Sequence, residues 1–205
     1  MKIPHKRALL VAGIWLVLFP AILYGQSAEA PVYKDGDWWR IKQEITRVGF
    51  DVSGPCSEAY EEYVVRIAGG KPNVFGLTNN RETATECPLI AAKVLGRADL
   101  KFPLYAGLSW SERRSRQVPG RRPTSVDYKY EVTAWEKVKT PKGEFEAFKV
   151  VKSFLLSPPG AKGIQSRWQI QTYYYAPALK AIVQYRAEDE GFTATTILVD
   201  SSLAQ

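Results

Sequence analysis

Histidine is almost missing from this sequence: among 205 residues only His5 is a histidine, and it lies in an N-terminal segment that we expect to be removed. Without imidazole, the remaining chain excludes Ser-His-Asp and Cys-His nucleophilic catalysis and every metal site with histidine ligands. Two cysteines are too few for a four-thiolate zinc site. No Gly-x-Gly-x-x-Gly or P-loop pattern occurs either. The sequence therefore predicts a protein without a metal ion or an organic cofactor.

The first 30 residues have the layout of a secretory signal peptide. Ala28-Glu29-Ala30 resembles a cleavage site, and an apolar run over residues 8–24 follows three basic side chains, Lys2, Lys6 and Arg7. Because Pro31 comes directly after that site and disfavours cleavage, cleavage after Gly25 is an alternative. The apolar run of about 17 residues is near the lower limit for spanning a bilayer, so an uncleaved membrane anchor is a further alternative. No cysteine follows the run, which argues against a lipid-anchored lipoprotein.

The overall charge of the chain is mildly basic. The sequence has 28 basic and 21 acidic side chains, a formal net charge of +7, which is less than a nucleic-acid-binding surface usually carries. The hydrophobic fraction of 45% is enough for a core. We therefore expect residues 31–205 to form one β-rich domain, periplasmic or secreted, with no nucleic-acid partner.

Cys56 and Cys87 are predicted to form a disulfide, because exported proteins enter an oxidising compartment. Both cysteines lie beside turn-forming prolines, Pro55 and Pro88. Closing this loop would stabilise the fold by about 3–4 kcal/mol in the chain-entropy model. Two separate buried thiols are the alternative. The absence of a Cys-x-x-Cys pattern argues against redox catalysis.

Apolar and polar residues alternate along most of the chain, which is the pattern of strands with one buried face. The clearest strand covers residues 125–134, and others are predicted over 38–45, 63–67, 148–155, 168–174, 181–185 and 192–199. Helix is expected only over 87–100 and as a single turn over 143–148. The architecture is therefore mainly β: a curved antiparallel sheet or half-barrel of about seven to nine strands with one or two short helices. A sandwich is the alternative.

Two motifs in the second half resemble uncharacterised secreted β-rich proteins of the bacterial envelope. One is the Gly-x-Phe-x-Ala-Phe-Lys-Val stretch over 143–150, and the other is Tyr174-Tyr175-Ala176-Pro177. These proteins are similar in fold to the lipoprotein-localisation factors LolA and LolB, so the resemblance implies a curved sheet in an envelope compartment and no assigned catalytic motif. Lys180 stands where they usually have glycine, at a position where the chain is expected to turn tightly.

A dense run of arginines is the candidate anion-binding or partner-binding site, because guanidinium groups suit phosphate and carboxylate. We expect the run to be a loop, and a solvated loop without a ligand is the alternative. Its members are Arg113, Arg114, Arg116, Arg121 and Arg122.

Aromatic residues make up 12% of the chain, and the run Tyr173-Tyr174-Tyr175 places rings on both faces of one strand. One face fills the core, and the other exposes rings or lines a cavity. A sheet covered on both sides is the alternative. The candidates for lining an apolar ligand cavity are Trp38, Trp39, Trp110, Tyr128, Tyr130, Trp168 and Tyr174.

These features favour an exported, non-catalytic protein that binds a lipid or another amphiphile of the cell envelope. The alternative is an assembly factor that contacts another envelope protein through a strand edge or the arginine run, and contact with a membrane surface is compatible with both. A carboxylate-based hydrolase is a remote alternative, because glycoside hydrolysis needs two acids about 5–9 Å apart. The candidate acids form two ordinary charged runs, Glu58, Glu61 and Glu62, and Glu188, Asp189 and Glu190.

Overall fold

The chain is mainly β-strand in the computed structural model, which describes residues 26–47, 60–97, 99–116, 124–156, 167–189 and 192–203. The strands of the main sheet are β2 (Trp38–Arg47), β3 (Glu62–Ala68), β4 (Lys71–Thr78), β5 (Arg81–Thr85), β7 (Ser109–Arg116), β8 (Thr124–Thr140), β9 (Gly143–Leu156), β10 (Arg167–Ala176), β11 (Ala181–Asp189) and β12 (Phe192–Ser201). Two short strands, β1 (Ser27–Ala28) and β6 (Leu104–Tyr105), pair separately. Helix α1 covers Pro88–Leu95, and a 3-10 helix, η1, covers Pro177–Leu179.

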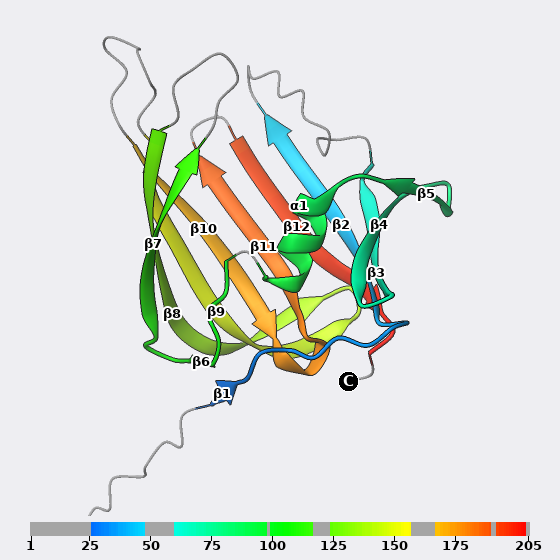
Figure 1. The fold of residues 1–205 in the computed structure, drawn as a ribbon, viewed down its shortest axis with the longest axis horizontal. Helices are drawn as coiled ribbons and strands as arrows, with labels where there is room; N and C mark the ends of the chain where they lie inside the picture. The colour runs from blue at the N-terminus through cyan, green and yellow to red at the C-terminus, as the bar shows by residue number, and fades with distance from the viewer. Residues whose placement is uncertain are drawn as a thin grey trace, which may run out of the picture.

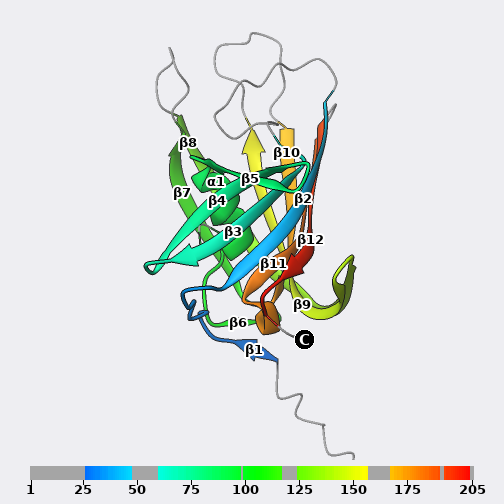
Figure 2. The ribbon, with the colours of Figure 1, turned by 90° about the vertical axis from the view of Figure 1, so that its right-hand side faces the viewer.

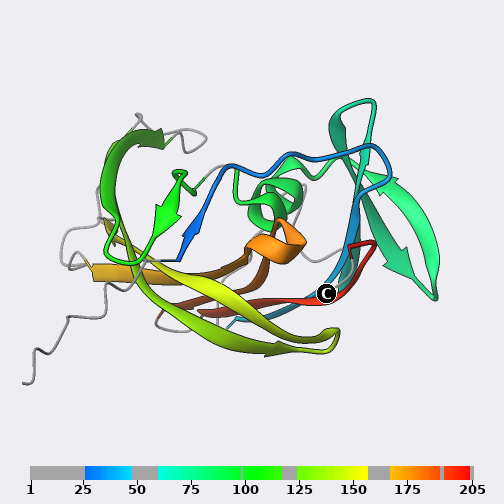
Figure 3. The same ribbon diagram turned by 90° about the horizontal axis from the view of Figure 1, so that it is seen from below.

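The ten strands form one antiparallel sheet in the order β5-β4-β3-β2-β12-β11-β10-β9-β8-β7. The sheet curves into an open half-barrel, and α1 lies on its concave side (Figures 1 and 3). Figure 2 views the molecule from the side of β3, β4 and β5, with α1 behind them. This arrangement gives the sheet an inner face toward the helix and an outer face away from it.

Helix α1 is short because residues in its own sequence set where it begins and where it ends. Pro88 occupies the first turn, where a missing N–H costs nothing. Gly96 ends the helix in the left-handed conformation, with φ of 66°, and an added Cβ there would lie 2.5 Å from the side chain of Leu100. The helix buries Ile90, Ala91, Val94 and Leu95 against the inner face.

The far end of the β8–β9 hairpin bends across the outer face of the sheet (Figure 3). A register shift between Val132 and Ala134 marks the bend, since bulges increase twist and redirect a strand. Beyond it, Phe145 is buried in the same core cluster as Leu198 of β12. At the hairpin tip, Lys142 donates hydrogen bonds to Asp200 Oδ1 at 3.0 Å and to the Ser201 carbonyl at 2.9 Å.

The start of β2 and the segment before it hold η1 in place. The indole N–H of Trp39 donates to the Leu179 carbonyl at 2.8 Å, and the Tyr33 hydroxyl donates to the carbonyls of Leu95 and Lys180. Lys180 takes the left-handed conformation with φ of 52°, so the tight turn after Leu179 forms without glycine. Its ammonium lies 3.3 Å from Asp37 Oδ2, and this ion pair offsets part of the backbone strain.

The curved antiparallel sheet is confirmed, but the predicted number of strands is wrong: the main sheet has ten, not seven to nine. Strand β4 was not predicted because Pro72, Asn73 and Gly76 interrupt its alternation, and β5 was not predicted because it is short and almost fully exposed. The expected helical turn over 143–148 is wrong as well, because Gly143 begins β9. The other predicted helix is shorter than residues 87–100, since Gly96 ends it.

The predicted disulfide involves a residue outside the described ranges. Cys87 is buried directly before α1, whereas Cys56 lies outside the described residues, so the pairing stays a prediction. Residues 1–25, which make up most of the expected signal peptide of residues 1–30, also lie outside them.

Candidate functional site

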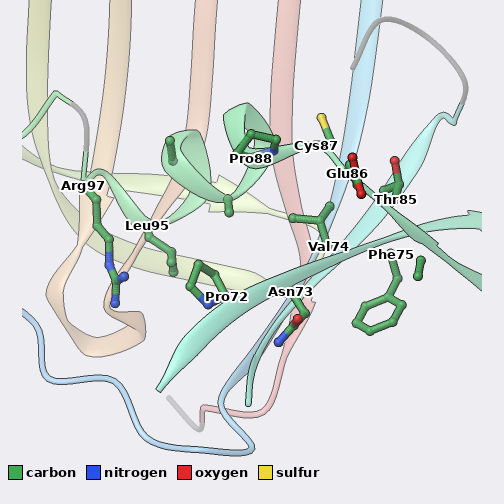
Figure 4. A pocket seen from close by; sticks show the side chains of 13 residues that line it. Pro72, Asn73, Val74, Phe75, Thr85, Glu86, Cys87, Pro88, Leu95 and Arg97 are labelled. Carbon is green, nitrogen blue, oxygen red and sulfur yellow. The ribbon is translucent and has the colours of Figure 1, made fainter. Parts of the chain in front are cut away.

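A cavity of about 680 Å³ opens between α1 and the strands β4 and β5 (Figure 4). Val74 of β4 and Ala91, Ala92 and Leu95 of α1 supply apolar walls. Its size lies within the range of small-molecule pockets, and its lining is mostly apolar, as such pockets usually are. The cavity is therefore suited to an apolar chain or ring.

A positively charged side chain, that of Arg97, lies at one end of this cavity. Arg97 follows the helix directly and lines the cavity (Figure 4). Its guanidinium lies 4.8 Å from the centre of the Tyr33 ring, which fixes the side chain by a cation–π contact. Burial raises the pKa of Tyr33 to about 12, against the lowering effect of Arg97, so Tyr33 stays neutral at ordinary pH. An apolar cavity with a cation at its end matches an amphiphile that has an anionic or polar head.

On the other part of the inner face, one carboxylate collects donors from four adjacent strands. Asp99 comes from the segment after α1, and its side chain is only 15% exposed. Its Oδ1 accepts hydrogen bonds from Lys152 Nζ at 3.0 Å, Arg114 at 3.1 Å and the Tyr130 hydroxyl at 2.9 Å. Its Oδ2 accepts from the Tyr173 hydroxyl at 2.8 Å. Asp99 therefore ties the post-helix segment to β7, β8, β9 and β10.

The electrostatics of this Asp99 cluster follow from its burial. Burial acts to raise the pKa of Asp99, but the charge and hydrogen bond of Lys152, with the two tyrosine hydroxyls, hold that pKa below its usual range. Burial lowers the pKa of Lys152, and Asp99 offsets part of this. Asp99 therefore stays ionised at neutral pH, which makes it a poor general acid.

A further cation adjoins the Asp99 cluster from the helix side. The Lys93 ammonium lies 5.0 Å from the centre of the Tyr185 ring. Burial lowers the pKa of Lys93 more than the attraction of Asp99 raises it. Among the described residues, its ammonium has no hydrogen-bond or ion-pair acceptor, whereas the Arg114 guanidinium is also bound by Glu112.

An exposed apolar patch lies on the outer face of β9 and β10. Trp168 is 59% exposed and Ile170 is 54% exposed, and Leu155, the register partner of Trp168, is exposed too. Two nearby cationic side chains are paired with acids, Lys149 with Glu136 and Arg186 with Glu188, and the Lys129 ammonium lies 6.0 Å from the centre of the Trp168 ring. Large exposed apolar side chains often mark contact surfaces. Contact with a membrane surface stays a prediction.

The arginine run is a strand in part, so its assignment as a loop is wrong for residues 113–116. Arg113 is exposed and makes a bidentate pair with Asp127, with bonds of 2.7 and 2.9 Å. Arg114 points inward to Asp99. Arg116 ends β7, while Arg121 and Arg122 lie outside the described residues. Strand alternation thus separates neighbouring arginines onto opposite faces of the sheet.

The predicted aromatic candidates fall into different environments. Trp39 is fully buried in the core, and Trp38, its neighbour in β2, is half-buried. Three rings gather on the inner face beside the Asp99 cluster: Trp110 stacks on Tyr130 with centroids 4.9 Å apart, and Tyr128 lies 4.6 Å from the Lys152 ammonium. Trp168 and Tyr174 lie together on the outer face, beside a shallow hollow of about 470 Å³. None of the seven lines the cavity beside α1.

The candidate catalytic acids do not converge in the described part of the chain. Glu62 pairs with Arg40 through a 2.6 Å hydrogen bond, and Glu188 pairs with Arg186 at 3.8 Å at the other side of the sheet. Glu58 and Glu190 lie outside the described residues. No group of three or more acidic or cysteine side chains within the described ranges is placed to hold a metal ion.

Sequence reasoning missed Asp99, Lys93 and Lys152. An isolated charged residue inside an apolar strand was the available signal: Lys152 interrupts the run Phe148–Leu155, and lysine is almost never fully buried unless it is paired. The position of its partner was not available, because Asp99 is 53 residues away.

No protein family matches the chain, and no curated protein is detectably similar to it in sequence. Three solved structures are distantly similar to it. A candidate lipoprotein from Parabacteroides distasonis has a TM-score of 0.43 and 12% identity, over 85% of this chain and 99% of that one. A candidate exported protein with a YmcC-like fold from Bacteroides fragilis has a TM-score of 0.38 and 14% identity, over 85% and 99%. The hypothetical lipoprotein YmcC from Escherichia coli has a TM-score of 0.38 and 10% identity, over 80% and 84%.

These likenesses are too distant to carry an argument about the site. The similarity to LolA and LolB implied by the sequence motifs is not among them and stays a prediction. No helix in the described part of the chain has the length and apolar character needed to cross a bilayer.

Proposed function

We propose that this chain is an exported, non-catalytic protein that binds an amphiphilic ligand in the cavity between α1 and strands β4 and β5. The observation that carries the proposal is an apolar cavity of about 680 Å³ with Arg97 at one end. The apolar part of the ligand would lie along Val74 and Leu95, and its head group would lie at the guanidinium. Arginine suits carboxylate and phosphate heads, since its planar fork donates two parallel hydrogen bonds.

The signal-peptide layout supports export, and the packing of β1 supports cleavage after Gly25 rather than after Ala30. Ala28 of β1 pairs with Leu104 of β6 and is buried in the inner core cluster. Cleavage after Ala30 would remove this strand, whereas cleavage after Gly25 would keep it. The denatured mass of the mature protein distinguishes the two sites.

Native mass spectrometry tests the proposal directly. The protein is purified gently from the envelope of its own cell and weighed under native and denaturing conditions. The expected native mass exceeds the denatured mass by a few hundred daltons, the weight of a small amphiphile. An unliganded native mass, together with no uptake of fluorescent fatty acids or phospholipids by delipidated protein, would refute the proposal.

Matched variants locate the binding site. Ala92→Trp fills the cavity from α1, and we expect it to weaken binding of a fluorescent fatty acid by about tenfold or more, since the ring takes the place of the ligand. Ala178→Trp, at the exposed position of η1, is the matched control and should bind like the wild type. Arg97→Met should weaken a fatty acid more than the corresponding neutral alcohol, while the exposed Arg81→Met should weaken neither. Equal effects in cavity and control variants would place the ligand elsewhere.

The second candidate function is assembly with another envelope protein. It is favoured by the open sheet: among the described residues, β5 and β7 each have a strand on one side only, and an unpaired edge can accept a strand from a partner. Cross-linking in cells tests it, with Arg113→Ser as the variant on the β7 side. Loss of a cross-linked partner in this variant supports the assembly function, and cross-linking that yields no partner counts against it.

A further inference from the structure

We propose that the inner face around Lys93, Trp110 and Gln169 is a second binding site, which takes a phosphate-type oxyanion. The proposal does not depend on the cavity beside α1. It rests on a surplus of positive charge and on buried donors without acceptors, both on the concave side of the sheet.

Curvature brings side chains from distant strands together at this place. β7 and β10 are separated by two strands, yet Arg114 from β7 and Tyr173 from β10 both reach the same Asp99 carboxylate. In the register of the sheet, Trp110 is opposite Tyr130, Tyr130 is opposite Lys152, and Lys152 is opposite Gln171. Side chains from four strands, which would lie about 4.8 Å apart per strand on a flat sheet, therefore meet at Asp99.

Positive charge exceeds negative charge in this region. Three cations, Lys93, Arg114 and Lys152, face two carboxylates, Asp99 and Glu112. Asp99 and Glu112 are engaged with Arg114 and Lys152, which leaves the Lys93 ammonium over the Tyr185 ring without an acceptor among the described residues. A half-buried ammonium costs stability unless it is paired. An anion would pair it.

Two further donors point to the same class of ligand. The Trp110 indole N–H and the Gln169 side-chain NH₂ are buried and have no hydrogen-bond partner. Trp110 stacks on Tyr130, a member of the Asp99 cluster, and Gln169 is the next inward residue along β10 from Gln171, which is hydrogen-bonded to Tyr173. Buried polar groups are nearly always paired in folded proteins. A tetrahedral oxyanion has acceptor oxygens in several directions, which suits donors carried by the helix, β7 and β10 of the concave side.

The test uses the mature protein, purified after processing in its own cell. It measures the binding of two probes, inorganic phosphate and dihexanoyl phosphatidic acid, each against chloride at equal ionic strength. Isothermal titration and the shift in melting temperature are the readouts. We expect at least one probe to bind and to raise the melting temperature above the chloride control. Binding of both with similar affinity identifies a free phosphate as the ligand class, and stronger binding of the lipid identifies a phosphorylated head group. If neither probe binds, the proposal is wrong.

Lys93→Met removes the unpaired ammonium and keeps the shape of the side chain. We expect it to weaken the probe that binds by about tenfold or more, which is the effect of one charge-assisted hydrogen bond. Lys139→Met, an exposed lysine on β8, is the control for net charge and should bind normally. Trp110→Phe keeps an aromatic ring to stack on Tyr130 and removes the N–H with the rest of the pyrrole ring, so it gives an independent loss of binding. Equal affinity in Lys93→Met and Lys139→Met would overturn the proposal.

The same titrations separate this site from the cavity of the proposed function. Ala92→Trp should leave phosphate binding intact while it blocks fatty-acid binding, and Lys93→Met should do the reverse. If Ala92→Trp abolishes phosphate binding as well, there is one site and not two, and the inference of a second site is wrong.

Discussion

Replacing Asp99 by asparagine is expected to destabilise the fold strongly. Asparagine keeps the shape of the side chain but removes the charge, so Lys152 and Arg114 would face a neutral amide. The Lys152 ammonium cannot turn into solvent, because its side chain is only 9% exposed on the inner face. The change therefore leaves a buried ammonium without a counter-charge.

The expected loss is about 3–5 kcal/mol, which is the usual cost of breaking a buried ion pair by removing one partner. It is smaller than the sum of the four hydrogen bonds to Asp99, since contributions within one network are not additive. A loss of that size is a large part of the roughly 5–15 kcal/mol that holds an ordinary domain together. Lys152→Met in the Asp99→Asn background should restore part of the stability, because it removes the unpaired charge.

Urea denaturation measures this effect through the midpoint at constant slope. Asp127→Asn is the matched control, because Asp127 also binds an arginine of β7 through two hydrogen bonds but is 60% exposed. We expect the control to shift the midpoint little, since exposed ion pairs contribute little to stability. Equal shifts in the two variants, or no recovery in the double variant, would refute the idea that the Asp99 charge holds a buried cation in place.

The pH dependence of the same variant has a defined sign. Because Lys152 and the other donors outweigh burial and hold the pKa of Asp99 below its usual range, the carboxylate contributes stability above its unfolded pKa of about 3.9. That contribution is lost as pH falls through the lower folded-state pKa. The difference between wild type and Asp99→Asn should therefore be constant from neutral pH to about pH 4 and shrink below it.

Three other changes have expected outcomes that urea or thermal denaturation checks. Gly76→Ala should cost about 1–3 kcal/mol, because its Cβ would lie 2.2 Å from the Tyr60 ring, and the cost should vanish in a Tyr60→Ser background. Lys180→Gly should be more stable than Lys180→Ala by about 1 kcal/mol, because both lose the ion pair with Asp37 but only glycine is unstrained at φ of 52°. Lys93→Met should raise the melting temperature by roughly 2–4 °C at neutral pH. That gain should fall as pH rises through the lowered pKa of Lys93, where the wild type loses its buried charge.

The sequence was sufficient to predict the class of the fold, because alternation is a local property. Val126, Tyr130 and Val132 of β8 are buried on one face as their spacing predicted. The motif residues Phe145 and Phe148 are also buried. The alternation pattern does not predict a strand that buries no apolar face. Strand β5 is exposed along most of its length, so no local pattern distinguishes it from a loop.

The arginine run shows a different limit. The density of the run, five arginines within ten residues, predicts a solvated loop. In the strand over 109–116, however, successive side chains point to opposite faces of the sheet. Arg113 is exposed beside Asp127, and Arg114, one residue later, is tied to a buried carboxylate. The same residue type therefore has two roles in adjacent positions, and only the register with β8 decides which.

The candidate sites were beyond sequence reasoning because each depends on how α1 crosses the half-barrel. One flank of the helix contributes Ala91, Ala92 and Leu95 to the apolar cavity, and the adjacent position, Lys93, faces the Tyr185 ring. Residues at successive helical positions point about 100° apart, so one short helix can line an apolar cavity and a polar cluster at once. A helix that only closed the core would have no need of a lysine at the half-buried position 93. Because the unpaired Lys93 ammonium lowers the stability of the fold, an anion should be sought at this position first.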